Sequence, residues 1–344
     1  MKSTVPYIPT EFDSNISVIK NFAADMCSQS YSEVSSLCDL MLATPKVNEN
    51  FMKGGRSGLN SDGTPLQFCI SSKKEGWAGR FITDPASTYQ QAEMRFSKSL
   101  DAINQLFYRT NSMALKGLFD EMVAFHLPKS KQVEDYSDGV FWIGAPVSGP
   151  GIAIYMDGRR GGDHIAWNRL KQWIEKIMPD IQELNPWISE MQKVSKIMSI
   201  GFEGSNLKNV RIKIYWRLKE AVLLDNLGCD LLKNDAFKIF LSDLAENNEM
   251  ALNGMVFSLG IHLATQQFFD VKIDMCGCRG CLAYSDDKWL DKINYFTDQY
   301  GLAPFPIDEQ LLHQKADISY FGMGLDIKGN KRLNLYLNSK LNDG

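Results

Sequence analysis

The segments SIGFEGSNLKNVRIKIYWRL at residues 199–218 and SYFGMGLDIKGNKRLNLYLN at residues 319–338 have the same pattern. In each, a glycine-containing run leads through a polar turn into a second run that carries Arg-x-polar-x-Tyr. Two strand-like runs joined by such a turn are the sequence form of a β-hairpin. The chain is therefore predicted to contain a repeated hairpin.

Three weaker copies of the hairpin are PLQFCISSKKEGWAGRFITDP from Pro65, VFWIGAPVSGPGIAIYMDG from Val140 and MVFSLGIHLATQQFFDVKIDM from Met255. A segment with helical apolar spacing follows each of the first four hairpins. These segments are AEMRFSKSLDAINQLFYR from Ala92, AWNRLKQWIEKIM from Ala166, AFKIFLSDLAENN from Ala236 and KWLDKINYFTDQY from Lys288. The predicted order is hairpin, helix, hairpin, helix, within a single domain over residues 1–344.

Two further segments, at residues 16–42 and 219–232, also have helical spacing and would complete an outer layer of helices. The stretch KSKQVEDYSDG from Lys129 is predicted to be an exposed loop. No Pro/Ser-rich linker or block of charge separates one part of the chain from another, which favours one domain.

The second strand of each clear hairpin sorts into two faces, because successive side chains of a strand point to opposite sides. In RIKIYWR at residues 211–217, one face carries Arg211, Lys213, Tyr215 and Arg217. The other face carries Ile212, Ile214 and Trp216. The same division occurs in RLNLYL at residues 332–337 and in VKIDM at residues 271–275. One face of the sheet is therefore aliphatic, and the other is rich in Arg, Lys and Tyr with little acid among them.

The aliphatic face is expected to pack against the helices, so the polar face must point the other way. In an open sheet that polar face would be exposed to solvent, as is common for antiparallel sheets. Ten strands strain an open twisted sheet, however, and closure removes the edges that invite aggregation. The predicted fold is α+β, a closed ten-stranded antiparallel β-barrel of five ββα-type repeats surrounded by a ring of helices.

Closure turns the polar face into a lumen, and its residue types indicate a ligand. Converging Arg and Lys side chains suit a strongly anionic group. Tyrosine hydroxyls add hydrogen bonds, and tyrosine rings present a π face that stabilises a cation. A ligand that consists of a diphosphate beside a carbocation needs both the basic side chains and the tyrosines.

The chain resembles the dimethylallyl-tryptophan-synthase type of aromatic prenyltransferase, the ABBA fold. The short pieces LNSDGTPLQFCIS, GRFITDP and RIKIY resemble that family's strands, and the alternation of elements resembles its barrel over nearly the whole chain. The resemblance implies transfer of a dimethylallyl or geranyl group from its diphosphate to an aromatic or electron-rich acceptor, through an allylic cation. It implies no required cofactor and no essential magnesium.

The resemblance also assigns roles to residues. As diphosphate binders it implies Arg80, Arg211, Lys213 and Tyr215, to which the lumen face adds Lys272 and Arg332. As cation-shielding tyrosines it implies Tyr155, Tyr215 and Tyr336. Glu203, on the same face as Gly201, is the candidate carboxylate for a general base.

Three positions depart from the family pattern. Gln67 stands where indole-modifying members have a Glu, and a neutral amide cannot act as a general base, so tryptophan becomes a doubtful acceptor. Gln67 either lines the site or is held by structural hydrogen bonds. Ala153 stands where the family often has Lys, and Lys272 and Asp274 replace a polar-x-Tyr pair, with Lys272 as a substitute for the missing lysine.

The acceptor is left open between an indole alkaloid, an amino acid and a peptide, in secondary metabolism. Two alternatives remain, namely a non-catalytic barrel that binds an anionic small molecule and a peptide-modifying prenyltransferase. Oligomeric state is also open.

Composition sets further bounds. The formal net charge of −4 and the pI of about 5.7 argue against a nucleic-acid partner. The sequence offers no export signal and no membrane segment, which predicts a cytoplasmic protein.

Cys276, Cys278 and Cys281 lack a fourth ligand at zinc spacing, so no metal is predicted. Asp286 and Asp287 are interpreted as an ordinary helix start.

Overall fold

The structure is a computed structural model of the 344-residue chain. It describes residues 11–43, 57–60, 63–87, 89, 91–127, 139–182, 184–220, 230–246, 252–276, 278–314 and 316–339. The predicted loop from Lys129 and most of the predicted helix at residues 219–232 lie outside these ranges. Of that segment, the structure describes residues 219–220, which are not helical, and residues 230–232, which lie in the 3₁₀ turn Asp230–Lys233.

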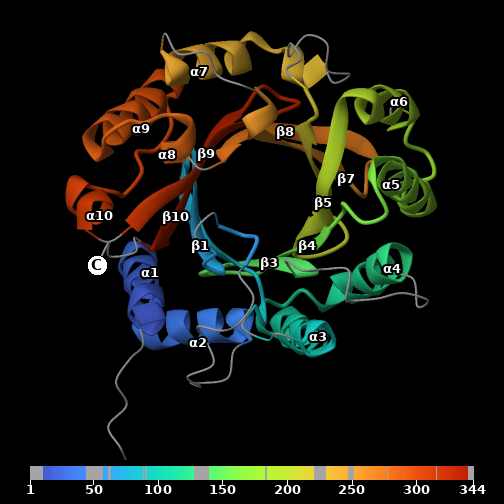
Figure 1. Cartoon of the computed structure of the whole chain (residues 1–344), viewed down its shortest axis with the longest axis horizontal. Coiled ribbons are helices and arrows are strands. Elements are labelled where there is room, and N and C mark those ends of the chain that lie inside the picture. The colour runs from blue at the N-terminus through green and yellow to red at the C-terminus, as the bar shows by residue number, and fades with distance from the viewer. Residues whose placement is uncertain are drawn as a thin grey trace, which may run out of the picture.

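Ten strands form one closed barrel, in which every neighbouring pair is antiparallel and β1 pairs with β10 (Figure 1). The strands are β1 (Leu66–Lys73), β2 (Gly76–Thr83), β3 (Phe141–Pro146), β4 (Ile152–Asp157), β5 (Ser195–Gly204), β6 (Arg211–Leu218), β7 (Met255–His262), β8 (Gln267–Cys276), β9 (Ala316–Asp326) and β10 (Lys331–Ser339). The five predicted hairpins are confirmed, as is the closed barrel.

Helices surround the ring of strands on its outside (Figure 1). They are α1 (Glu11–Cys27), α2 (Tyr31–Leu42), α3 (Ala92–Arg109), α4 (Lys116–His126), α5 (Asp163–Ile177), α6 (Leu184–Val194), α7 (Asp235–Ala245), α8 (Cys278–Cys281), α9 (Asp286–Tyr300) and α10 (Glu309–Gln314). The segment at residues 16–42 forms two helices rather than one, because the chain turns at Ser28 (φ 51°) and Ser30 caps α2 by accepting from the Glu33 N–H. Among the described residues, no helix combines the length and apolar character needed to cross a membrane.

The predicted division of the strands into two faces is confirmed. Ile212, Ile214 and Trp216 of β6 are fully buried in the hydrophobic core between the barrel and the helices. Trp187 of α6 packs edge-to-face on Trp216, with ring centroids 5.4 Å apart. The alternate residues of β6 point into the barrel, where they line cavities. The aliphatic face thus holds the helices, and the polar face is free for a ligand.

Glycines on the first strands of the hairpins make room for the large polar side chains of the second strands. Gly201 of β5 pairs with Lys213 and Tyr155, Gly260 of β7 pairs with Lys213, and Gly324 of β9 pairs with Lys272. A β-carbon at Gly260 would overlap the carboxylate of Asp270, and one at Gly324 would lie within 3 Å of the Arg332 guanidinium. The recurrence of glycine in these hairpins therefore follows from crowding inside the barrel.

Gly201→Ala is expected to destabilise the protein, because its β-carbon would overlap the backbone carbonyl of Ile154 in a neighbouring strand. We expect a loss of about 1–3 kcal/mol in the free energy of unfolding, the usual cost of overpacking. The control is Gly117→Ala in α4, where a β-carbon meets nothing within 4 Å and where alanine favours a helix by about 0.5–1 kcal/mol. Urea unfolding of both variants measures the difference, and equal stabilities would contradict the crowding argument.

Candidate functional site

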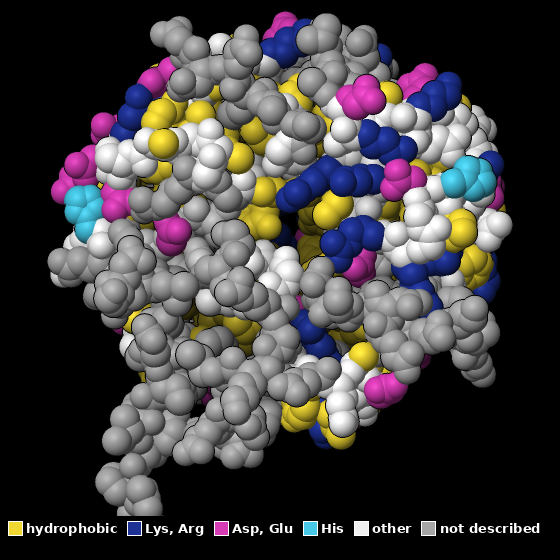
Figure 2. Space-filling model, viewed as in Figure 1, with side chains coloured by type: hydrophobic (Ala, Val, Ile, Leu, Met, Phe, Trp, Pro, Cys, Tyr) yellow, Lys and Arg dark blue, Asp and Glu magenta, His cyan; other side chains and the backbone are white. Residues whose placement is uncertain are grey.

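Two adjacent cavities fill the lumen. The larger, of about 880 Å³, is lined by polar and charged side chains and extends to the hairpin turns at Lys74 and Gly329. The smaller, of about 190 Å³, is lined mainly by aromatic and apolar side chains. Arg80, Tyr215 and Lys272 line both, so the two cavities meet at the level of these residues. Figure 2 shows one end of the barrel, hollowed near its centre, with Lys and Arg side chains beside the hollow.

A basic cluster, here defined as Arg80, Arg211, Lys213 and Arg332, lies in the larger cavity, and three of its members contact Asp270. Arg211 Nη1 donates to Asp270 Oδ2 at 2.8 Å, Arg332 Nη2 donates to the same oxygen at 2.7 Å, and Lys213 Nζ donates to Oδ1 at 3.0 Å. These bonds join strands β6, β8 and β10 across the barrel. Asp270 is 0% exposed, and burial opposes its charge, but the three cations hold its pKa well below the usual range.

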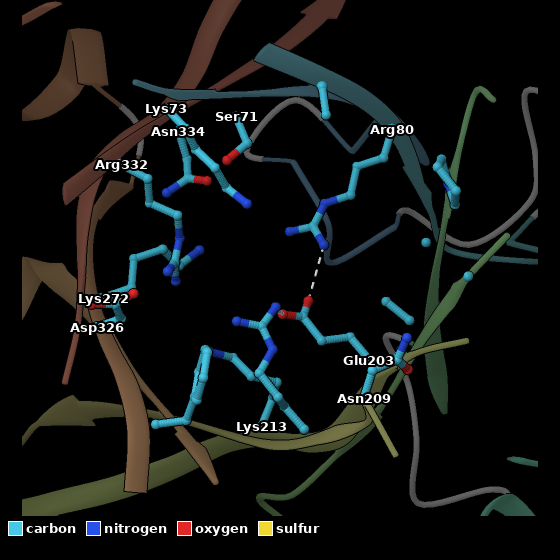
Figure 3. Close-up of a pocket in the computed structure, with 18 of the residues that line it drawn as sticks. Ser71, Lys73, Arg80, Glu203, Asn209, Lys213, Lys272, Asp326, Arg332 and Asn334 are labelled. Atoms are coloured by element: carbon cyan, nitrogen blue, oxygen red, sulfur yellow. Dashed lines mark hydrogen bonds and ion pairs between the residues drawn. The ribbon is translucent and has the colours of Figure 1, made fainter. Parts of the chain in front are cut away.

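Glu203 is the second carboxylate of this region. It accepts from Arg80 Nη1 at 3.0 Å and from Tyr155 Oη at 3.1 Å, and it forms an ion pair with Arg211. Figure 3 shows Arg80 of β2 and Glu203 of β5 extending toward each other in the lumen. Burial would raise the pKa of Glu203, but Arg211 and Arg80 hold it well below its usual value. A carboxylate so stabilised in its charged form is a weak base.

Lys213 lines the same cavity as the arginines and is 1% exposed. Burial lowers its pKa to about 8, although Asp270 and Glu203 act in the opposite direction. Its ammonium group is therefore charged at neutral pH but is close to losing its proton. Burial would lower the pKa values of Arg80 and Arg211, but neighbouring acidic groups raise them, so both stay charged over the same range.

Three tyrosines lie next to the basic cluster, where the two cavities meet. The rings of Tyr155 and Tyr215 pack edge-to-face with centroids 5.2 Å apart. Lys272 Nζ donates to Tyr336 Oη at 2.6 Å and lies 5.6 Å from the Tyr215 ring centroid and 5.1 Å from that of Tyr336. Burial raises the pKa of all three phenols above the usual value, so they stay neutral. We call Tyr155, Tyr215 and Tyr336 the tyrosine tier. Two of its members, Tyr215 and Tyr336, already lie next to a cation, the Lys272 ammonium group.

No family model and no curated protein matches the chain. Among solved structures, it is similar to 5-dimethylallyltryptophan synthase from Streptomyces coelicolor, with 15% identity, a TM-score of 0.74 and coverage of 97% of this chain and 99% of that one. It is also similar to 6-dimethylallyltryptophan synthase from Micromonospora olivasterospora in complex with DMASPP and Trp, with 12% identity, a TM-score of 0.77 and coverage of 96% and 98%. The binary complex of PriB with product diphosphate matches at 13% identity, a TM-score of 0.74 and coverage of 96% of each chain. The chain has the prenyltransferase barrel fold.

Gln67 lines the smaller cavity of this prenyltransferase barrel and is 2% exposed. Its Nε2 donates to Asn60 Oδ1 at 2.6 Å and to Ser319 Oγ at 3.3 Å. The side chain is therefore held by structural hydrogen bonds and also faces the cavity, which is compatible with both interpretations of the sequence. Ala153 faces the larger cavity and leaves space where a lysine would project.

The expectation of little acid on the lumen face is wrong. Glu203, Asp270 and Asp274 all lie there, each paired with Arg or Lys. Asp270 was not identified from the sequence, although it lies on the same face of β8 as Lys272 and Asp274. Extending the alternation from Lys272 two residues toward the N-terminus would have found it. The carboxylates are needed because several buried cations cannot be held side by side without counter-charge.

Two further groups of side chains lie at the edge of the site or away from it. His262 lines the larger cavity and faces Thr265, with His262 Nδ1 and Thr265 Oγ1 3.3 Å apart. The interpretation of Asp286 and Asp287 as a helix start is confirmed, because Ser285 caps α9 by accepting from the Lys288 N–H. Within the described ranges, no group of three or more His, Cys, Asp and Glu side chains is arranged to hold a metal ion.

Proposed function

We propose that this chain transfers a prenyl group from an allylic diphosphate to an aromatic or electron-rich acceptor. The observation that carries the proposal is the adjacency, in one closed lumen, of the basic cluster and the tyrosine tier. The first suits an anionic leaving group, and the second suits the allylic cation that forms beside it. The similar structures of PriB with product diphosphate and of 6-dimethylallyltryptophan synthase with DMASPP and Trp support the proposal.

In this proposal the donor diphosphate binds in the larger cavity to Arg80, Arg211, Lys213 and Arg332, with Lys272 reaching it from the tyrosine tier. Each guanidinium has five N–H donors, so Arg211 can bind phosphate oxygens without giving up Asp270. The C–O bond of the donor breaks, and its electron pair leaves with the diphosphate. Fixed cations at that point stabilise the growing charge without reorganisation, which is the electrostatic contribution to catalysis.

The allyl group then lies against Tyr155, Tyr215 and Tyr336, with the acceptor in the smaller cavity. Neutral phenol rings stabilise the cation through their π faces and keep water from capturing it. The ring of the acceptor attacks the allyl carbon. We propose dimethylallyl or geranyl diphosphate as donor, with no cofactor, and an indole alkaloid, amino acid or peptide as acceptor.

We further propose residues 1–344 as one catalytic unit acting in the cytoplasm, in secondary metabolism. The continuous barrel supports the first part, because its strands come from both ends of the chain.

Calorimetric titration with dimethylallyl thiolodiphosphate, in the presence of EDTA, tests the donor site. We expect saturable binding, followed by product formation when dimethylallyl diphosphate and an aromatic acceptor are supplied together. Binding without any product would point to a non-catalytic binding barrel. Failure to bind either this analogue or its geranyl counterpart would remove the prenyltransferase proposal.

Donor binding is expected to weaken as the pH rises through about 8, because Lys213 loses its proton there in the free protein. A single coupled proton changes the affinity by about tenfold per pH unit above that value. Titrations between about pH 7 and pH 9.5 measure the slope. The Lys213→Arg variant is the control, since its side chain stays charged and its slope should be flat. A wild-type slope of zero would contradict a role for Lys213 in binding the donor.

A further inference from the structure

We infer that Asp274 accepts the proton that the aromatic acceptor loses, and that Lys272 passes this proton on to the departing diphosphate. The inference rests on the proposed prenyl transfer. A base is needed because the amide of Gln67 is neutral and cannot accept the proton. Glu203 is poorly placed for this role, because Arg80 and Arg211 hold its carboxylate in the donor cavity.

Asp274 is placed on the acceptor side of the site. It lies on the lumen face of β8, is 4% exposed and lines the smaller cavity. Of the described residues that line this cavity, it is the one that carries a carboxylate. Glu203 lines the larger cavity, and Asp270 lies beside it among the cations. A base has to reach the acceptor, and position therefore favours Asp274.

The two oxygens of Asp274 have different surroundings. Oδ2 forms an ion pair with Lys272. Oδ1 is buried and has no hydrogen-bond partner within the described part of the chain. It lies over Gly322 of β9, where a β-carbon would overlap it. A buried carboxylate oxygen without a donor is costly, so it is poised to accept a proton or an N–H from a ligand.

Lys272 connects this carboxylate to the donor. It lines both cavities, bonds Tyr336 at 2.6 Å and pairs with Asp274. Its ammonium group thus stands between the proposed positions of the acceptor and the diphosphate. A lysine in this position can give a proton to one side while it takes one from the other.

The proton balance is as follows. After the aromatic π pair has formed the bond to the allyl carbon, the acceptor's C–H or N–H bond returns its electron pair to the ring and its proton to Asp274. Lys272 gives one ammonium proton to a diphosphate oxygen and takes the proton from Asp274. The pair regains its starting charges, and one proton has moved from acceptor to diphosphate. Once the new bond has formed, the acceptor ring is a cation, an arenium ion, which is a strong acid. The position of the base therefore matters more than its strength.

The test is Asp274→Asn, which keeps the size and a hydrogen-bond acceptor for Lys272. Wild type is first screened with dimethylallyl diphosphate and four acceptors: L-tryptophan, L-tyrosine, indole and 1,6-dihydroxynaphthalene. For the acceptor that reacts, we expect kcat of the variant to fall by about 10²–10⁴-fold, the usual contribution of a positioned base. The Kd for dimethylallyl thiolodiphosphate should change by less than about threefold. The control is Asp291→Asn, an exposed aspartate of α9 that lines neither cavity, which should keep wild-type kcat.

A kinetic isotope effect separates a base from a structural residue. With the acceptor deuterated on its ring, Asp274→Asn should show a primary isotope effect that wild type lacks, because proton loss becomes rate-limiting. Should Asp274→Asn not fold, Asp274→Ser replaces it, since it removes the carboxylate with a smaller side chain, and the same isotope effect is expected. An unchanged kcat, or a reduced kcat without the isotope effect, overturns the inference alone. If wild type binds no donor or reacts with none of the acceptors, the proposed function falls, and the inference with it.

Discussion

Asp270→Asn is expected to lower the free energy of unfolding by about 3–5 kcal/mol, the cost of removing one partner from a buried ionic network. Asp270 of β8 is fully buried and neutralises Arg211 and Lys213 of β6 and Arg332 of β10. Asparagine has the same size but no charge, so Lys213 and Arg332 would lose their carboxylate partner and Arg211 would keep only Glu203. Urea unfolding followed by circular dichroism measures the loss.

Asp291→Asn is the matched control for this prediction, because Asp291 is exposed on α9 and an exposed change usually stays within about 0.5 kcal/mol. A loss below about 1 kcal/mol for Asp270→Asn would show that the cluster does not depend on this carboxylate. Added diphosphate should restore part of the lost stability, because it replaces the missing negative charge and binds the folded state.

Arg211→Ala and Lys213→Ala are each expected to reduce kcat/KM for dimethylallyl diphosphate by about 10²–10³-fold, the effect of removing one charge-stabilising donor from an active site. The double variant should lose less than the product of the two, because both side chains bond Asp270 and are therefore coupled. Initial rates at varied donor concentration give the ratio.

Lys208→Ala tests whether any cation of the same hairpin would have this effect. Lys208 is exposed in the turn between β5 and β6, outside the lumen, and its removal should leave kcat/KM unchanged within about twofold. Unchanged turnover in both lumen variants, with circular dichroism showing intact folding, would overturn the assignment of the diphosphate site to the basic cluster.

The sequence was sufficient to predict the barrel because one rule, the alternation of sides along a strand, applies to every hairpin. The same rule placed Arg211, Lys213 and Tyr215 on one face. It could not show that Asp270 bonds residues of β6 and β10, because those contacts arise from closure and from the irregular pairing of β7 with β8 at Gly260. The helices α4 and α6 were also missed. Short helices of this kind are held by tertiary packing more than by their own spacing.

The pairing of β1 with β10 has a consequence for the order of events during synthesis. β1 emerges from the ribosome early, but its second neighbour is the last strand of the barrel to be made. Until then, β1 has an open edge, and the partial sheet lacks Arg332 and Tyr336, which β10 carries. The nascent chain therefore must protect an exposed sheet edge through most of its translation, and both the ring and the ligand site become complete in a single late step.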